Sequence, residues 1–354
     1  MAVRAPRPAS PGADNLTRAI EFGDPGYLPC TLGVNLDWLY ERDEGKRQHI
    51  RDLLGQFRQD VFGGLGAARS DEPKTVAGVS RWRDEWGTGW EDDGHGAKTE
   101  SYPLIEGYDG LADYDFPDPH LEGRFDEADR RLRERDGQYA RSTVWFTLFE
   151  RLWMLRGFEN MLVDPYVDEG AFRGLRDRVL EYNLAIIDQW MERGVDAVFF
   201  SDDWGSQKGL LMDPDDWRRL YLPAYRRMFE RVRSGGAHVW MHLCGDVTAI
   251  LPDLVDIGLN VLNPVQPQAM DVRELSREFG GRLCFDGGVD VQGTLIRGST
   301  DDVRREVDEL VYLFGRFAGG YIGDTSHSVM PETPLDNVVA MLEAFLTYHR
   351  PGNP

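Results

Sequence analysis

Two side chains that can bind a metal, His242 and Cys244, stand two residues apart in a segment with the period of a β-strand. Along residues 237–245, apolar side chains at alternate positions separate His238, Trp240, His242 and Cys244, so the two sets face opposite sides of a strand. Zinc accepts imidazole nitrogen and thiolate sulfur together. The pair predicts a metal site at the strand end. The alternative is a hydrogen-bonded histidine beside a cysteine that packs as a small apolar residue.

His327 is the candidate for a third ligand. Residues 320–325 are predicted as the last strand, and Thr325 and His327 fall on one face at its end. Cys284 is excluded because it begins its strand, and four residues at about 3.3 Å each leave it far below the strand end. A histidine that hydrogen-bonds substrate or caps a helix is the alternative for His327.

A pair of carboxylates, Asp202 and Asp203, follows another apolar strand at 194–201. Carboxylates at such a place can bind a metal, hold a cationic group or act as a general base if burial raises one pKa. We therefore take Asp202, Asp203 and His327 as candidate catalytic residues. The alternative is that an aspartate here caps the next element and stays solvated.

Amide, carboxylate and aromatic side chains near other strand ends suit recognition of a small molecule. Turn formation alone also explains the glycines at 287 and 288. A Schiff-base mechanism has less support, because Lys208 is the one lysine near a strand end. The candidate substrate-binding residues are Gln207, Asn263, Gln266, Asp286, Asp290, Gln292 and Trp86.

The second half of the chain alternates strands with helices at a spacing typical of parallel βαβ units. Six strands are expected from residue 142 onward, with two more hidden upstream, and no glycine-rich phosphate loop follows an early strand. We predict an α/β fold, a (β/α)8 TIM-type barrel with an irregular N-terminal extension. The predicted strands are 142–148, 194–201, 237–245, 261–265, 283–289 and 320–325, and the helices are 125–135, one from Phe149, 168–193, 213–234, 249–257, 270–279, 299–317 and 335–348.

The first third of the chain is harder to interpret. Residues 1–25 are rich in Pro, Ala, Arg and Gly and predict a flexible lead-in, which leaves 26–349 as a single barrel domain. Residues 37–63 suggest one or two helices. Residues 70–123 have no sustained period and predict an irregular lid or a pocket wall built on tryptophan packing.

Composition narrows the partners and the compartment. The formal net charge is -21, from 61 acidic and 40 basic residues, which disfavours nucleic acid and anionic membranes. Three scattered cysteines cannot form a disulfide framework and suit a reducing compartment. With no apolar run near the roughly 20 residues of a membrane span, we expect a cytoplasmic protein.

These motifs together resemble the uroporphyrinogen decarboxylase superfamily over residues 140–349. The resemblance rests on His242-Leu243-Cys244-Gly245, Asn263-Pro264-Val265-Gln266, the run from Phe285 to Gln292, Gly319-Gly320-Tyr321 and His327. It implies a (β/α)8 barrel with its pocket at the carboxyl face.

Two branches of the superfamily imply different reactions. Its true decarboxylases carry an Arg-Gln-Ala-Gly-Arg-Tyr-type segment that this chain lacks. Its cobamide-dependent methyltransferases share the His-x-Cys pair and bind zinc with a further cysteine, where this chain has His327. The resemblance therefore favours the methyltransferase branch. It implies a corrinoid on a separate protein as methyl donor, and a homodimer.

The leading hypothesis is zinc-assisted methyl or alkyl transfer to a small thiol or similar nucleophile, with zinc held by His242, Cys244 and His327. The alternatives are a metal-independent decarboxylase acting on a small carboxylated substrate, and a barrel that binds a ligand or corrinoid protein without turnover.

Overall fold

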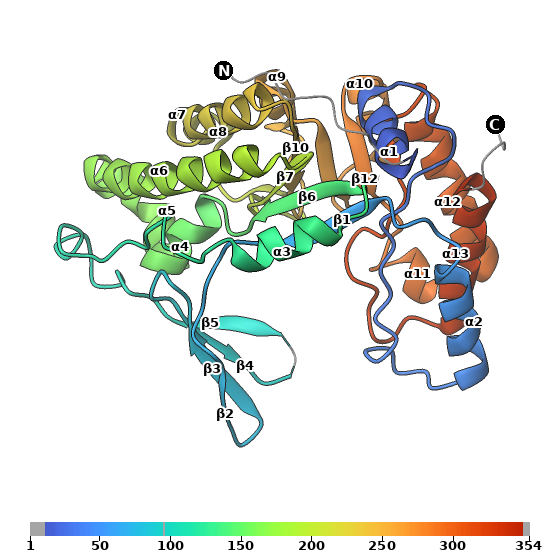
Figure 1. Cartoon of the computed structure of the whole chain (residues 1–354), viewed down its shortest axis with the longest axis horizontal. Coiled ribbons are helices and arrows are strands. Elements are labelled where there is room, and N and C mark those ends of the chain that lie inside the picture. Colours follow the sequence, from blue (N-terminus) through green and yellow to red (C-terminus); the bar gives the residue numbers. More distant parts are fainter. Residues whose placement is uncertain (1–10, 95, 350–354) are drawn as a thin grey trace.

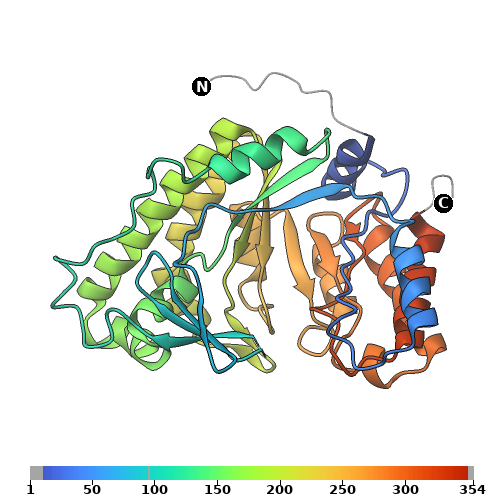
Figure 2. The ribbon, with the colours of Figure 1, turned by 60° about the horizontal axis from the view of Figure 1, so that its bottom comes forward.

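The computed structural model describes residues 11–94 and 96–349, and a curled parallel sheet organises this part of the chain (Figures 1 and 2). Cys30 adds a parallel bridge to Gly323 at the far edge of the sheet, which makes it the first strand position of the barrel. In spatial order the strands are β1 (Val61–Leu65), β6 (Tyr139–Val144), β7 (Ala197–Ser201), β10 (His238–His242), β11 (Val261–Val265), β12 (Cys284–Gly287) and β13 (Tyr321–Ile322).

The predicted (β/α)8 fold is confirmed, including the six strands from residue 142 onward and two strand positions upstream. The strands are apolar because both faces are covered: all five residues of β7 are buried. Helices follow the strands on the outside: α4 (Phe149–Arg156), α5 (Phe158–Val167), α6 (Glu169–Arg193), α7 (Pro214–Leu220), α8 (Leu222–Ser234), α9 (Leu251–Ile257), α10 (Val272–Phe279), α11 (Thr294–Arg297), α12 (Thr300–Gly315) and α13 (Leu335–His349). None of the described helices is long and apolar enough to cross a membrane.

The N-terminal end of the barrel is closed by α1 (Pro11–Glu21). Leu16 and Ile20 of this helix pack with Trp240 and Cys284 in a separate apolar cluster beneath the pocket. A flexible lead-in was expected over residues 1–25; residues 11–21 instead form a packed helix, because their apolar side chains recur at helical spacing. Residues 1–10 lie outside the described part of the chain.

The predicted helical region 37–63 contains one helix, α2 (Glu44–Leu54), and then β1. Residues 70–123 were expected to be irregular, but they include an antiparallel sheet that projects from the barrel (Figure 1). These strands are short and largely solvent-facing, so they carry little hydrophobic period. They are β2 (Lys74–Val76), β3 (Val79–Arg83), β4 (Gly89–Asp92) and β5 (Ala97–Ser101), and α3 (Asp126–Glu134) leads back to β6.

The barrel wall has an open seam between its first strand position and β1. Among the described residues, no backbone ladder joins Cys30 to β1, whereas Cys30 does pair with Gly323 on its other side. A side pocket of about 340 Å³ occupies this seam, lined in part by Arg58, Asp60 and Arg141. The barrel lumen therefore has polar openings at its mouth and at its side.

Candidate metal centre and pocket

Three side chains that can bind a metal converge at the carboxyl ends of the strands. His242 ends β10, Cys244 follows two residues later, and His327 lies beyond β13. One donor atom from each of these residues lies within 4.8 Å of the others, and Cys244 Sγ is 3.3 Å from His242 Nε2. This spacing allows all three donors to reach one ion, and the set of two imidazoles and one thiol is of the kind that zinc accepts.

A chain of hydrogen bonds fixes the orientation of the His242 ring. His242 Nδ1 is 2.8 Å from Asn263 Oδ1, and Asn263 Nδ2 donates to Asp286 Oδ2 at 2.7 Å. Because the amide oxygen can only accept, His242 carries its proton on Nδ1 and keeps the lone pair of Nε2 toward Cys244. Metal-binding histidines are commonly held by such an outer partner.

The turn after β10 positions Cys244. Its backbone N–H donates to Asp203 Oδ1 at 2.9 Å, and the Gly245 N–H donates to Gln266 Oε1 at 2.6 Å. Gly245 has φ +79°, and a Cβ at this position would overlap the backbone of Gly205. A glycine is therefore required directly after the cysteine.

The electrostatics of the cluster suit a metal ligand set. Burial, followed by the charge of Asp203, raises the pKa of the Cys244 thiol well above its ordinary value. Burial and the neighbouring His242 lower the pKa of His327, which favours its neutral ring. A thiol in such surroundings keeps its proton until a cation offsets the thiolate charge, which a bound metal does.

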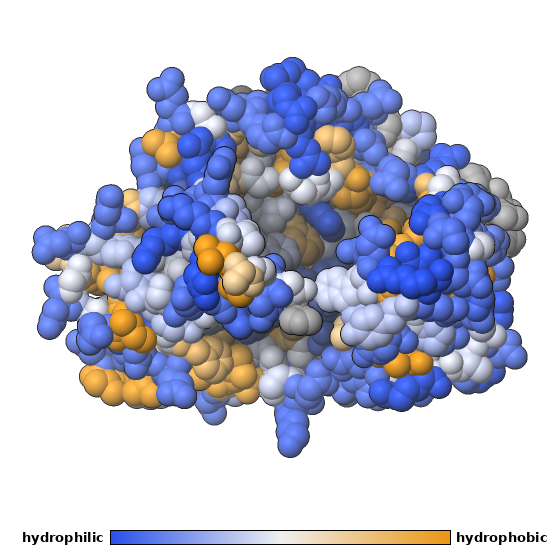
Figure 3. Space-filling view, turned by 90° about the horizontal axis from the view of Figure 1, so that it is seen from below, coloured by the Kyte–Doolittle hydropathy of each residue, from blue (hydrophilic) through white to orange (hydrophobic). Residues whose placement is uncertain are grey.

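The cluster borders a pocket of about 630 Å³ in the barrel mouth. Figure 3 shows this face of the molecule hollowed at its centre. Asn263 and Asp286, both predicted to bind substrate, lie in the pocket wall beside His242 and His327. The lining residues are Thr31, Gly33, Gly64, Arg141, Thr143, Trp145, Phe199, His242, Asn263, Pro264, Asp286, Asp324, Thr325, His327 and Ser328.

Two acids, the buried Asp286 and the half-buried Asp324, share a hydroxyl at the floor of this pocket. Thr31 Oγ1 is 3.1 Å from Asp286 Oδ1 and 2.9 Å from Asp324 Oδ2. Burial and the charge of Asp324 raise the pKa of Asp286 to about 7. The Thr31 hydroxyl can donate its proton to only one carboxylate at a time. A proton held by the other carboxyl group lets that group donate to the hydroxyl oxygen.

The structure corrects the role expected for Asp202. Its carboxylate is fully buried and accepts hydrogen bonds from the backbone N–H groups of Leu148, Phe149 and Glu150 and from Tyr225 Oη. It caps the start of α4 and has no room for a substrate. Asp203, its neighbour, lies beside the cluster, with Oδ1 3.9 Å from His242 Nε2.

Five predicted substrate residues lie away from the pocket lining, and one of them, Gln266, accepts from the Gly245 N–H in the turn after β10. Gln207 and Gln292 are exposed in loops, and Gln207 shares the turn between β8 (Gly205–Ser206) and β9 (Gly209–Leu210) with Lys208. Asp290 is buried and accepts from Gln268 Nε2 at 2.6 Å. Strand ends supply many polar groups, and only those on the lumen side reach the pocket.

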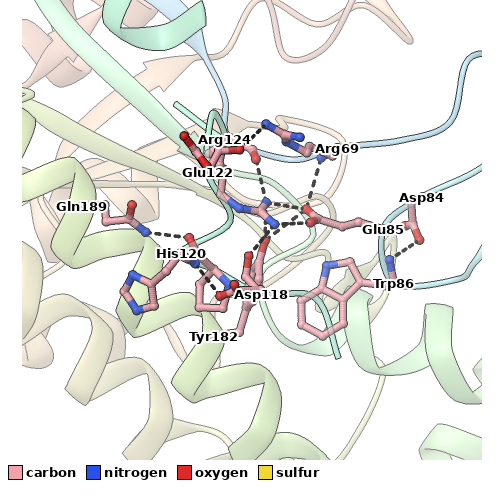
Figure 4. Close-up of polar contacts among 12 residues, drawn as sticks. Arg69, Asp84, Glu85, Trp86, Asp118, His120, Glu122, Arg124, Tyr182 and Gln189 are labelled. Carbon is pink, nitrogen blue, oxygen red and sulfur yellow. Dashed lines mark hydrogen bonds and ion pairs between the residues drawn. The ribbon is translucent and has the colours of Figure 1, made fainter. Parts of the chain in front are cut away.

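The fifth, Trp86, packs under the projecting sheet beside a buried ion pair (Figure 4). Its ring meets Tyr182 edge to face, with centroids 4.6 Å apart. Arg124 Nη2 and Glu85 Oε2 are 2.5 Å apart next to it, with 1% and 11% of their side chains exposed. This cluster joins the sheet to α6, so the observed contacts of Trp86 are structural.

Sequence reasoning missed several residues of the pocket, above all Arg141, Trp145, Thr31 and Asp324. A signal was present for two of them. Arg141, Thr143 and Trp145 alternate along the predicted strand that begins near 142, as lumen-facing residues must. Thr31 follows the single bridge at Cys30, which is too short to produce an alternating pattern in the sequence. Asp324 follows β13, a strand of two residues.

The fold and this cluster define a class: a (β/α)8 barrel with a candidate His/Cys metal-ligand set beside a pocket at its carboxyl face. The family model of uroporphyrinogen decarboxylase (URO-D) matches residues 145–348, more than half of the chain, so the chain belongs to that family. The resemblance inferred from the sequence is confirmed.

Individual relatives include members of both branches. The methylcobamide:CoM methyltransferase MtaA of Methanosarcina barkeri is 28% identical over 178 residues, which cover 50% of this chain and 49% of that protein. A uroporphyrinogen decarboxylase of Solibacter usitatus is 25% identical over 178 residues, with the same coverage of 50% and 49%. The chain thus spans about half the length of these curated relatives. A solved methyltransferase from Methanosarcina mazei shares the fold, with a TM-score of 0.66, 16% identity, and coverage of 96% of this chain and 99% of that one.

Proposed function

We propose that this chain is a zinc-assisted transferase that moves a methyl or alkyl group to a small thiol. The observation that carries the proposal is the convergence of His242, Cys244 and His327, with donor atoms within 4.8 Å of one another at the edge of a 630 Å³ pocket. The similarity to a methylcobamide:CoM methyltransferase supports this chemistry.

Each residue has a defined part in the proposed reaction. His242, Cys244 and His327 would hold zinc, which supplies a Lewis acid that lowers the pKa of a thiol bound at its open position. The hydrogen bond of Asn263 keeps His242 Nε2 available. Asp203, beside His242 and Cys244, would accept the thiol proton.

The transfer itself then balances simply. The substrate sulfur forms a bond to the methyl carbon, and the bond between that carbon and the donor breaks with its electron pair left on the donor. We propose that the donor is a corrinoid carried by a separate protein, because a relative that matches half of this chain is named for methylcobamide.

Zinc content tests the proposal directly. We expect about one zinc per chain in wild-type protein purified without added metal, and little in Cys244→Ser. Cys284→Ser is the matched control, because Cys284 is a buried thiol in the cluster beneath the pocket. A folded wild type without zinc, or equal zinc in wild type and Cys244→Ser, would contradict the metal site.

A second candidate function is metal-independent decarboxylation of a small carboxylated substrate. The observation in its favour is the acid pair of Asp286 and Asp324, one of which can hold a proton beside the pocket. This reaction would resist chelators and would be lost in Asp286→Asn, whereas thiol alkylation would be lost on removal of zinc.

A further inference from the structure

Arg141 places a guanidinium in the barrel lumen between two cavities. It lines both the central pocket of about 630 Å³ and the seam pocket of about 340 Å³. Its Cζ atom lies 4.6 Å from the ring centroid of Phe199 and 4.5 Å from that of Trp240. The two aromatic rings hold the guanidinium by cation–π contact and leave its N–H groups to the cavities.

Among the described residues, no acid contacts this guanidinium directly: the Arg141 side chain has no hydrogen bond and no ion pair there, and the charges of Asp286 and Asp324 act on it only from a distance. By contrast, three arginines that are more fully buried are paired with acids, Arg124 with Glu85, Arg151 with Asp84 and Arg156 with Asp164. Burial lowers the pKa of Arg141, but a guanidinium does not lose its proton in proteins. A half-buried guanidinium whose N–H groups have no hydrogen-bond acceptor in the protein favours a ligand that accepts from them.

The nearby acids are already engaged elsewhere. Asp286 accepts from Trp240 Nε1 at 3.1 Å and from Asn263 Nδ2 at 2.7 Å, and Asp324 accepts from the Thr325 N–H at 2.8 Å. Both acids also share the hydroxyl of Thr31. The two carboxylates make the bottom of the pocket polar, but they accept no hydrogen bond from the Arg141 guanidinium.

The strand register relates Arg141 to the metal-ligand cluster. Trp240 pairs with Phe199 on β7, and His242 pairs with Ser201, two residues nearer the mouth. Since the guanidinium rests on Phe199 and Trp240, it lies about 7 Å below His242 along the strands. A short-chain molecule can span this interval.

We propose that Arg141 is the anchor of a carboxylate subsite, and that the substrate of this pocket carries a carboxylate at the end opposite its reacting group. A planar carboxylate matches the guanidinium fork by two parallel hydrogen bonds. A phosphate dianion fits less well, because Asp286 and Asp324 face the same floor and the pocket lining has no lysine.

The subsite deepens the proposed function, on which it rests for the assignment of this pocket to the substrate. It adds the substrate class, a small acid whose reacting group lies near His242 and His327. A single arginine in the pocket lining predicts a single carboxylate on the substrate. This arginine lies on β6, not near the N-terminus.

Metal-free protein tests the subsite separately from the zinc site. We would titrate chelator-treated protein with butyrate and with its neutral analogue butyramide, and follow binding by calorimetry and ligand-observed NMR. The wild type should bind butyrate saturably and butyramide at least about tenfold more weakly, because the neutral amide cannot form the charge-assisted pair of hydrogen bonds with the guanidinium.

Two substitutions at Arg141 and one control complete the test. Arg141→Met should lose butyrate binding, and Arg141→Lys should weaken it by about tenfold because the fork is lost while the charge stays. Arg58→Met is the matched control, because Arg58 lines only the seam pocket, and it should bind butyrate as the wild type does. Thermal unfolding would confirm that each variant is folded.

Any one of the following results would overturn the subsite: no saturable butyrate binding to the wild type, equal binding of butyrate and butyramide, or wild-type butyrate binding by folded Arg141→Lys. Inorganic phosphate that binds in place of butyrate would do the same. Zinc analysis of the same preparations keeps the two proposals apart. Butyrate binding without zinc in the wild type sinks the transferase and retains the subsite, whereas zinc without butyrate binding does the reverse.

Discussion

At the scale of single residues, the candidate metal centre depends on groups that do not touch the metal. Asn263 is one of these, because its oxygen 2.8 Å from His242 Nδ1 selects the tautomer whose Nε2 faces Cys244. Asp286 in turn fixes the amide of Asn263. A chain of hydrogen bonds therefore runs from His242 through the Asn263 amide to the buried Asp286, and each side chain fixes the orientation of its neighbour.

The first prediction concerns this outer partner. Asn263→Ala should weaken zinc binding by about 10–100-fold, because His242 loses the bond that fixes its ring and tautomer. Competition with a chromophoric chelator measures the affinity. Gln292→Ala removes an exposed amide at another strand end and should leave the affinity unchanged. Equal affinities in the wild type and Asn263→Ala would show that His242 does not bind the metal through Nε2.

At the scale of elements, the turn after β10 places the cysteine. Gly245 adopts φ +79°, and its backbone lies against Gly205, with no space for a side chain. The turn is further held by the bond from the Gly245 N–H to Gln266. Strand, glycine and a neighbouring loop together set the position of Cys244.

Gly245→Ala should therefore reduce zinc content, because the new methyl group forces the turn away from Gly205 and moves Cys244. Gly236→Ala is the matched control: Gly236 has φ +76°, but a Cβ there meets nothing within 4 Å. It should cost about 1–2 kcal/mol from backbone strain and retain zinc. Zinc analysis and urea unfolding of both variants distinguish steric overlap from strain.

The projecting sheet depends on a different element contact, the buried pair of Arg124 and Glu85 (Figure 4). Arg124→Met should lower the free energy of unfolding by about 3–5 kcal/mol, because Glu85 is left buried and unpaired. Arg130→Met should cost no more than about 1 kcal/mol, since Arg130 pairs with Glu127 and Glu134 at the surface. Urea unfolding measures both. A small loss in Arg124→Met would mean that Glu85 finds another partner or takes up a proton.

The elements also show what the sequence can and cannot predict. The alternation around His242 correctly predicted its face, because strand geometry leaves a side chain only two directions. The same reasoning failed for Asp202, whose hydrogen-bond partners at 148–150 lie more than 50 residues earlier in the chain. Short exposed strands such as β2 have no buried face and therefore no hydrophobic period. Local patterns report local geometry, and contacts between distant segments decide the rest.

At the scale of the whole molecule, the acidic balance extends into the interior. The chain carries 61 acidic and 40 basic residues, and several of the acids are buried. Burial raises the pKa of Asp60 to about 6 and that of Glu306 to about 7. The folded state consequently holds protons that the unfolded chain releases, so pH and stability are linked.

Glu306 makes this linkage measurable. Its ordinary pKa is 4.5, and burial raises it to about 7 in the folded protein, so between these values the folded state binds more protons than the unfolded state. The stability that Glu306 contributes is present below its unfolded pKa and is lost as the pH rises through about 7. Glu306→Gln removes this loss and keeps an acceptor for the Asp290 N–H. The variant should gain up to about 3 kcal/mol over the wild type between about pH 4.5 and pH 8, with no further gain above that. Urea unfolding across this range measures the difference.

Glu309→Gln, on the same helix and paired with Arg273, gives the effect of removing one acidic charge, which is subtracted. A difference between Glu306→Gln and the wild type that does not change with pH would mean that Glu306 is ionised in the folded protein throughout, and that water or a cation reaches it from the side of α12.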